Sequence, residues 1–222
     1  MTLYLGGTLV GSSKVYLGST PASKIYLGTT QIWPSFDPVG QTFTATGAYT
    51  YNIPAGATFI DVVLLSGGGG GQGQGSFSTW GKGGDPGTWL TYTLVRGVDI
   101  PMGTLTITGS VGVGGTAGAG SVGISGGAGG PGGATTAVAT GWSGTHSAAG
   151  GSGGSGGTLI LSETYGKSPG DTTLNGRLYQ GGAQQTGAST AGNPPGGGGG
   201  AARITFQAGA AGARGQVWFY AY

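Results

Sequence analysis

"GSVGVGGTAGAGSVGISGGAGGPGGA", residues 109–134, holds thirteen glycines, one proline and no charged residue. Its glycines keep a spacing of three, first at 109, 112, 115 and 118 and then, after one slip of phase, at 120, 123, 126, 129 and 132. Three residues per turn is the repeat of a polyproline II helix. The stretch can therefore be a linker, a collagen strand or a packed element of a folded protein.

The composition of the whole chain bears on this choice. Glycine accounts for 57 of the 222 residues, and together with 10 prolines it reaches a level at which low-complexity disorder is the first expectation. The charge argues against disorder, because eight Lys/Arg and six Asp/Glu give a net charge of only +2. A chain with so little self-repulsion is expected to condense or to assemble.

Several classes of function are excluded by what the sequence lacks. The basic residues are scattered singly, so no stripe can follow a phosphate backbone, and nucleic acid is not an expected partner. The absence of cysteine excludes disulfides and thiolate metal sites. Because there is neither a secretion leader nor an apolar window of spanning length, we expect synthesis in a cytoplasm and no membrane insertion.

Collagen is the first alternative for the glycine tracts, and the register argues against it. Collagen needs glycine at every third position without interruption and is rich in proline, whereas here about five triplets run in phase around the single Pro131.

A bundle of polyglycine II helices fits better: left-handed threefold chains bond sideways, and a Cβ would hold their backbones apart. We therefore predict that Gly126, Gly129 and Gly132 face neighbouring backbone and that Ser125 tolerates change. We also expect a tract with glycine in two phases, such as 126–133, to lie deeper than a tract with one.

Between the tracts lie patterns typical of β-strands. The most apolar run, residues 59–65, predicts a strand buried on both faces at the centre of the core. Further β-branched or aromatic runs bounded by glycine or proline predict strands at 42–46, 48–53, 88–95, 104–108, 135–139, 158–162, 203–207 and 216–220. The predicted fold is all-β, an antiparallel β-sandwich with interleaved polyproline or polyglycine II tracts.

The N-terminal part repeats one short unit. It reads LYLGGT at 3–8, VYLGST at 15–20 and IYLGTT at 25–30, each the pattern of a very short strand and turn. One unit cannot bury its own face, so we predict that residues 1–35 form an attachment segment that adds to a partner's sheet or to other copies. Its candidate contact residues are Tyr4, Tyr16, Tyr26 and Trp33, and residues 36–222 form the glycine-rich domain.

Three passages together resemble a known family. These are the YLG[ST]T units, FTATGAYTYNIPAGATFIDVVLLSGGGGGQG at 43–73 and GGGGGAARITFQAGAAGARGQVWFYAY at 196–222. They look like the glycine-rich minor tail proteins of phages that infect mycobacteria and related actinobacteria. The triplet tracts are more distantly similar to the polyglycine sandwiches of some enterobacterial phage adhesins.

The resemblance implies a virion protein of the tail tip, made in the host cytoplasm and present as a homotrimer or in several copies. Its implied partners are other tail-tip proteins and a glycan or lipid of the host envelope, to which it would present loops. The resemblance transfers no receptor-binding residue.

Motifs of catalysis and cofactor binding are weak. GAGSVG at 118–123 matches G-x-G-x-x-G but opens no helix, and His146 has no partner at ligand spacing, so a loop hydrogen bond is expected of it. Asp85, Asp99 and Asp171 stand in turn contexts rather than as paired carboxylates for glycan cleavage. We therefore predict a protein without catalytic residues, cofactor or metal.

Aromatic side chains in loops are the candidate receptor contacts, because flat rings suit sugars and lipid-like envelope components. They are Trp80, Trp142, His146, Tyr165 and Tyr179. The alternative is that these rings cap glycine layers or meet a neighbouring subunit, in a purely structural tail-tip protein without host contact. An intracellular glycine-rich protein unrelated to phages is a third, more distant alternative.

Overall fold

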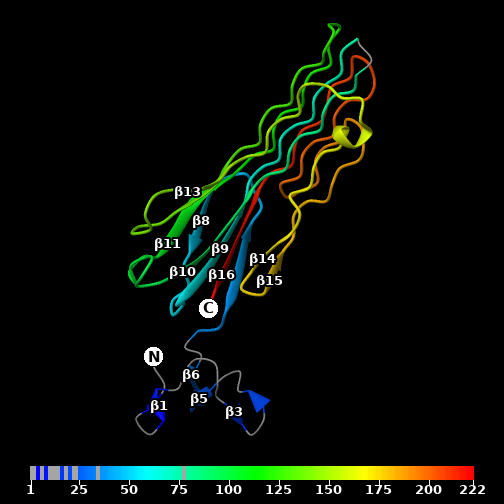
Figure 1. Ribbon diagram of the computed structural model, residues 1–222. Coiled ribbons are helices and arrows are strands. Elements are labelled where there is room, and N and C mark those ends of the chain that lie inside the picture. Colours follow the sequence, from blue (N-terminus) through cyan, green and yellow to red (C-terminus); the bar gives the residue numbers. More distant parts are fainter. Residues whose placement is uncertain are drawn as a thin grey trace.

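The computed structural model describes residues 4–5, 8–9, 16–17, 20–21, 25–33, 36–76 and 79–222. From residue 36 onward, two sheets lie at one end and a bundle of extended glycine tracts continues from them (Figure 1). In the described ranges the helical content is one 3-10 turn, η1 (Leu161–Thr164). No helix of this part of the chain has the length and apolarity needed to cross a membrane.

The two sheets have four strands each, and every neighbouring pair is antiparallel. The first sheet has the order β10-β9-β16-β7, with β7 (Val39–Phe43), β9 (Phe59–Leu65), β10 (Trp89–Val95) and β16 (Gln216–Ala221). The second has the order β13-β12-β11-β8, with β8 (Gly47–Asn52), β11 (Thr106–Val111), β12 (Thr135–Val138) and β13 (His146–Ala148). The all-β, antiparallel fold class is confirmed.

Side chains from both sheets form one hydrophobic core, which includes Ile60 and Val62 of β9 and Ile107 of β11. Phe219 of β16 stacks on Tyr51 of β8 with ring centroids 4.1 Å apart and planes 3° from parallel. Strand β9 is buried on both faces from its second residue, as predicted. Its other face is covered by a hairpin of β14 (Thr172–Leu174) and β15 (Arg177–Tyr179).

Two predicted strands are wrong and three strands were missed. Residues 158–162 contain an isolated bridge and the start of η1, and residues 203–207 form a turn in which Phe206 has φ 63°. The missed strands are β13, β14 and β15. The turn between β14 and β15 is Asn175-Gly176, with φ 48° and 76°, a dipeptide whose left-handed conformations favour tight hairpins.

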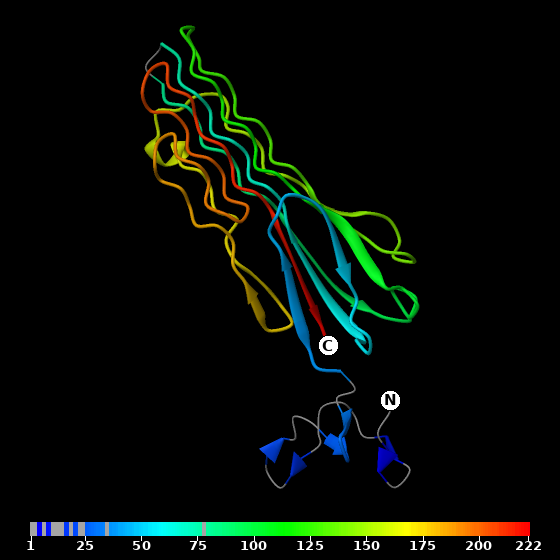
Figure 2. The same cartoon turned by 180° about the vertical axis from the view of Figure 1, so that it is seen from behind.

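Most of the glycine tracts continue a strand of the sandwich (Figure 2). β9, β11 and β13 run outward into the tracts 67–75, 112–120 and 149–155. The tracts 126–134 and 207–215 run back toward β12 and β16. The bundle therefore inherits the alternating chain directions of the antiparallel sheets.

The tract 67–75 lies inside the bundle, and its backbone N–H groups donate in rotation to three antiparallel neighbours. Donors three residues apart reach the same neighbour at N···O distances of 2.8 to 3.0 Å. Gly67, Gly70 and Gly73 donate to 127–133, Gly68, Gly71 and Gln74 to 207–213, and Gly69 and Gln72 to 82–85. Its carbonyl groups accept with the same period from three parallel neighbours, 115–121, 151–154 and 199–202. This rotation is what a threefold chain among six neighbours requires, and it satisfies the buried backbone.

Glycine is needed wherever two tracts meet. A Cβ built on Gly126, Gly129 or Gly132 would lie less than 3.0 Å from backbone atoms of the tract 67–75. These three residues thus face neighbouring backbone as predicted, and Ser125 is exposed.

Two details of the glycine pattern were interpreted wrongly. The glycines from 120 to 132 do not belong to one tract, because the chain reverses at residues 121–125 and makes 112–120 and 126–133 separate antiparallel tracts. The tract 126–133 is also not deep, since Ala128 and Pro131 are exposed. The deep tracts are 67–71 and 197–200, which have glycine in all three phases because a Cβ at each position would meet neighbouring backbone.

The N-terminal repeats form hairpins rather than single strands. Each YLG unit starts one antiparallel pair: β1 (Tyr4–Leu5) with β2 (Thr8–Leu9), β3 (Tyr16–Leu17) with β4 (Thr20–Pro21), and β5 (Ile25–Leu27) with β6 (Thr30–Trp33). The division into 1–35 and 36–222, and the addition of the repeats to a partner's sheet, stay predictions.

Candidate functional site

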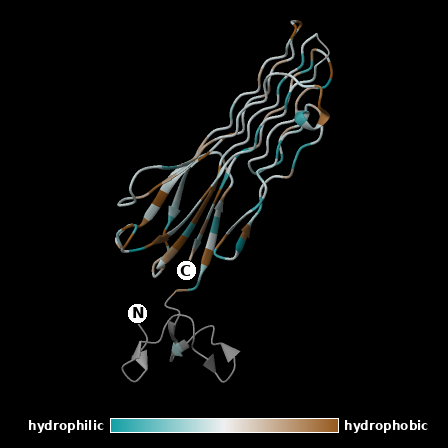
Figure 3. Ribbon diagram, in the orientation of Figure 1, coloured by the Kyte–Doolittle hydropathy of each residue, from teal (hydrophilic) through white to brown (hydrophobic). Residues whose placement is uncertain are grey.

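The end of the bundle away from the sheets carries exposed apolar side chains (Figure 3). We call this surface the distal tip. Val122, at the turn between two tracts, is 89% exposed. The members of the distal tip are Val122, Ile124, Ile204 and Phe206 in the turns at 121–125 and 203–207, and Leu159, Ile160 and Leu161 around η1, which lies on the side of the bundle rather than at its end (Figure 1). Such a concentration of exposed aliphatic side chains on a chain of this size is typical of a contact surface.

Backbone hydrogen bonds of the bundle hold the loops of the distal tip in place. Ser76 donates to the carbonyl of Gly123 from its backbone nitrogen at 2.8 Å and from Oγ at 2.9 Å. Gln74 donates to the carbonyl of Gln207 at 2.9 Å. The turns at 121–125 and 203–207 are thereby fixed to the same central tract.

The loop at residues 158–165 is tied to the turn at 203–207 by side-chain contacts and to Trp80 by the backbone. Arg203 donates from Nε to Thr164 Oγ1 at 2.8 Å and also bonds the carbonyl of Thr186. Its guanidinium lies 5.1 Å from the ring centroid of Tyr165. Trp80 pairs with Thr158 in an isolated β-bridge. The apolar side chains are therefore displayed by a hydrogen-bonded frame.

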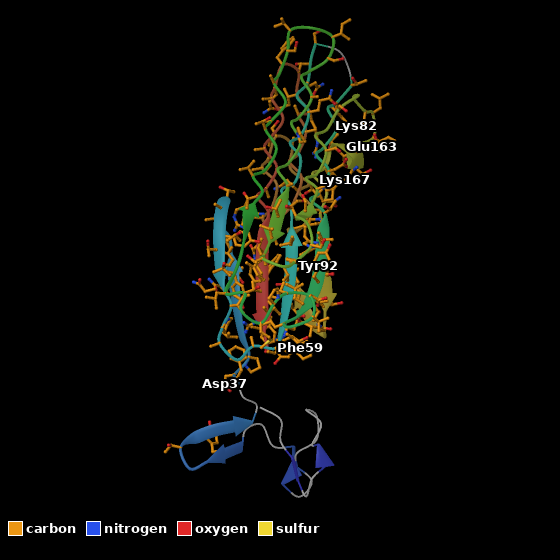
Figure 4. All side chains as sticks on the ribbon, turned by 90° about the vertical axis from the view of Figure 1, so that its left-hand side faces the viewer. Asp37, Phe59, Lys82, Tyr92, Glu163 and Lys167 are labelled. Atoms are coloured by element: carbon orange, nitrogen blue, oxygen red, sulfur yellow. The ribbon has the colours of Figure 1, made fainter. Side chains whose placement is uncertain are left out.

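Four of the chain's few charged residues form two ion pairs on one side of the bundle (Figure 4). Lys82 Nζ lies 3.4 Å from Glu163 Oε2, and Lys167 Nζ lies 2.6 Å from Asp85 Oδ1. The pKa of Glu163 is lowered, chiefly because the Thr158 hydroxyl donates to its carboxylate at 2.7 Å. A general acid needs a raised pKa, so this carboxylate is shifted in the opposite direction.

In the described part of the chain, no three His, Cys, Asp or Glu residues come together in a group that could hold a metal ion.

Trp142 and His146, two of the predicted receptor contacts, pack against each other and against the sandwich rather than standing free in a loop. Trp142 is only 9% exposed, and its ring stacks on His146 with centroids 3.7 Å apart. Tyr92 of β10 meets both rings, and Trp142 belongs to the sandwich core. His146 lies in β13 rather than in a loop, and burial lowers its pKa against a smaller opposing effect of a backbone hydrogen bond to Ser143.

The other three predicted aromatic contacts are dispersed. Tyr179, in β15, is 7% exposed and meets Trp218 edge to face, so it too lacks the free aromatic face that was predicted. Trp80 and Tyr165 are half-buried in the bundle near η1. The five residues do not form one surface, and their role as receptor contacts stays a prediction.

Of the four predicted attachment residues, Tyr26 is 52% exposed. The side chains of Tyr4, Tyr16 and Trp33 lie outside the described residues, although their backbones belong to β1, β3 and β6.

The residues of the distal tip were missed because two of its loops were interpreted as strands. Their signal is a short apolar run that stands between two glycine tracts and lacks a partner run of similar length. Val122 and Ile124 lack this signal, because the triplet spacing of glycine continues through 120, 123 and 126.

Comparisons with known proteins agree with this structure. Residues 44–222 match the model of the glycine-rich domain family. The chain is 57% identical over 219 residues to the Gene 32 protein of Mycobacterium phage L5, covering 98% of each chain. It is 53% identical over 220 residues to the Gene 32 protein of Mycobacterium phage D29, covering 96% of this chain and 97% of that protein. The chain thus belongs to the glycine-rich domain family and has phage-encoded relatives along almost its whole length.

Proposed function

We propose that this chain is a structural protein of a phage tail tip, whose distal tip contacts an apolar, lipid-like component of the host envelope. The observation that carries the proposal is the group of aliphatic side chains at the end of a backbone-bonded bundle. Aliphatic side chains supply apolar contact area with little hydrogen bonding, which suits acyl chains better than sugars.

The path of the chain supports an arrangement in which the distal tip points away from the rest of the phage tail. The chain enters the sandwich at Val39, which pairs with Ala221 at the end of the sheet away from the bundle. An attachment through residues 1–35 would therefore join the opposite end of the domain from the distal tip. The phage origin of both Gene 32 proteins supports a place in the virion.

A purely structural role is the second candidate. Val98, Met102 and Leu105 are exposed in loops of the sandwich, and neighbouring tail proteins or further copies of the chain could cover them. Both roles require incorporation into the virion, and only the first requires host contact.

The test is a phage that carries Val122→Ser, Ile124→Ser and Ile204→Ser together. We expect normal incorporation of the protein and a fall of about tenfold or more in adsorption rate, since a few central residues usually carry most of a binding energy. Leu105→Ser, an equally exposed aliphatic side chain of the sandwich, is the matched control and should adsorb normally. Unchanged adsorption of the triple variant would leave the structural role.

A further inference from the structure

A groove of about 630 Å³ lies on the face of the first sheet that the β14–β15 hairpin covers. It runs over β16 and the edge strand β7, and it lies in the sandwich rather than at the distal tip. Its aromatic residues include Trp218 and Tyr220, which alternate along β16 with the core residues Val217 and Phe219. Its polar side chains include Thr42, which lies opposite Trp218 on the same face, together with Gln180 and Gln216.

Arg177 lines this groove with its hydrogen-bonding capacity unused by the described residues. Three of the four arginines, Arg96, Arg203 and Arg214, each hold one or more backbone carbonyls. Arg177 makes no such bond and no ion pair within the described ranges, and its guanidinium lies 3.2 Å from the ring centroid of Tyr220. The N–H groups at its edges are therefore available to an acceptor on a ligand.

A second hollow of about 260 Å³ shares Arg177 and Tyr220 with the groove and is also lined by Asp61. Asp61 is wholly buried. Its Oδ1 accepts hydrogen bonds from Thr93 Oγ1 at 2.7 Å and from Asn175 Nδ2 at 2.8 Å, whereas Oδ2 has no partner among the described residues. A buried carboxylate oxygen without a donor is unfavourable, so a hydroxyl group that enters this hollow would stabilise it.

We propose that the groove and this hollow form one binding site for a neutral glycan. Each sugar hydroxyl both donates and accepts hydrogen bonds, which suits a groove lined by Arg177 and by polar side chains. A ligand must offer hydrogen-bond acceptors to the N–H groups of Arg177 and a donor to Oδ2 of Asp61. Hydroxyl groups do both. A phosphate or carboxylate would suit Arg177, but the negative charge of Asp61 would repel it. This site goes beyond the proposed function, because it takes a different ligand on a different surface.

The experiment uses the isolated full chain and short neutral oligosaccharides released from the host envelope by mild acid, with binding followed by saturation-transfer NMR and tryptophan fluorescence. The unmodified protein should bind. Arg177→Ala should raise the dissociation constant about tenfold or more, and Thr42→Ala should raise it severalfold. Lys167→Ala also removes one exposed positive charge, but this charge belongs to the ion pair with Asp85 on the side of the bundle. The Lys167→Ala protein should therefore bind like the unmodified protein.

Thermal unfolding of each variant checks folding, and if Arg177→Ala is unfolded, Thr42→Ala carries the test. The proposal is overturned if the oligosaccharides do not bind, if both groove variants bind normally, or if inorganic sulfate alone displaces the glycan at equal concentration, which would indicate an anion site. Failure here leaves the distal tip untouched, because all tip residues are intact in these variants. Conversely, a phage with the triple serine substitution should retain glycan binding by its purified chain.

Discussion

The centre of the sandwich and the centre of the glycine bundle are equally buried, but different groups hold them together. In the sandwich, side chains such as Ile60, Val62 and Ile107 are wholly inaccessible and pack against each other. In the bundle, the tract 67–75 is just as buried, but seven of its nine residues have no side chain. Its cohesion comes from backbone hydrogen bonds that point in every direction around the chain. Burial therefore does not require hydrophobic side chains when each peptide group has a partner.

This difference predicts opposite responses to a change of volume. A smaller side chain in the sandwich leaves a cavity that its neighbours can partly fill. A larger side chain in the bundle meets backbone atoms, which cannot rotate away as side chains do. Removing atoms should be the damaging change in one half, and adding atoms the damaging change in the other.

The largest effect is expected for Gly129→Val. The new Cβ would approach the backbone of Gly70 to less than 3.0 Å, and the central tract cannot move without breaking its bonds to the other neighbours. We expect a loss of more than about 4 kcal/mol in the free energy of unfolding, enough to prevent folding and assembly. Soluble yield and circular dichroism measure it.

Ser125→Val is the matched control for this prediction, because it adds a similar volume at the exposed turn before the same tract. It should fold and assemble normally. A Gly129→Val protein that folds as well as the Ser125→Val protein would mean that the tracts are loosely packed.

A smaller loss is expected when the sandwich core is truncated at Phe219→Ala. This change removes the ring stacked on Tyr51 and should lower the free energy of unfolding by about 3 to 5 kcal/mol. Urea unfolding gives the value, with the partly exposed Val138→Ala as control, expected within about 0.5 kcal/mol of the unmodified protein. If Phe219→Ala were neutral, the sheets would not depend on side-chain packing and the contrast between the halves would fail.

The smallest effect concerns His146, a titrating group in the sandwich. Burial lowers the pKa of His146 in the folded protein below the ordinary value of 6.5. As the pH falls through 6.5, the unfolded chain takes up a proton that the folded protein resists, so the free energy of unfolding decreases. Urea midpoints measured between about pH 7.5 and pH 5 should show this decrease, and the His146→Gln protein should show less of it. Identical pH profiles would mean that the ring is solvated in the fold.

The sequence predicts the local elements well where a strand is a continuous apolar run or where its apolar and polar residues alternate. The run at 59–65 and the alternation in β8 lead to strands at the observed places, and the threefold glycine spacing leads to tracts that meet backbone. The reversal at 121–125 escaped prediction because the glycine spacing is the same on both sides of the turn.

The candidate site was harder to predict than the fold. Whether Trp142 or Tyr179 is exposed depends on Tyr92 and Trp218, which lie far away in the chain and become neighbours only through the sheet pairing. The hollow beside the groove combines Asp61 of β9 with Arg177 of a hairpin more than a hundred residues later, and no local pattern relates the two. A sequence shows which side chains are available, and long-range pairing decides which of them remain free.

In the tract 67–75, the position of each residue in the threefold repeat determines which neighbouring tract its N–H group bonds. Inserting or deleting one or two residues would redirect every later N–H group to the wrong neighbour, whereas a change of three residues would restore all the partners. Tracts of this family should therefore differ in length by multiples of three, and neighbouring tracts should change together. Each triplet would extend the reach of the domain by about 9 Å, so that the length of the bundle evolves in steps.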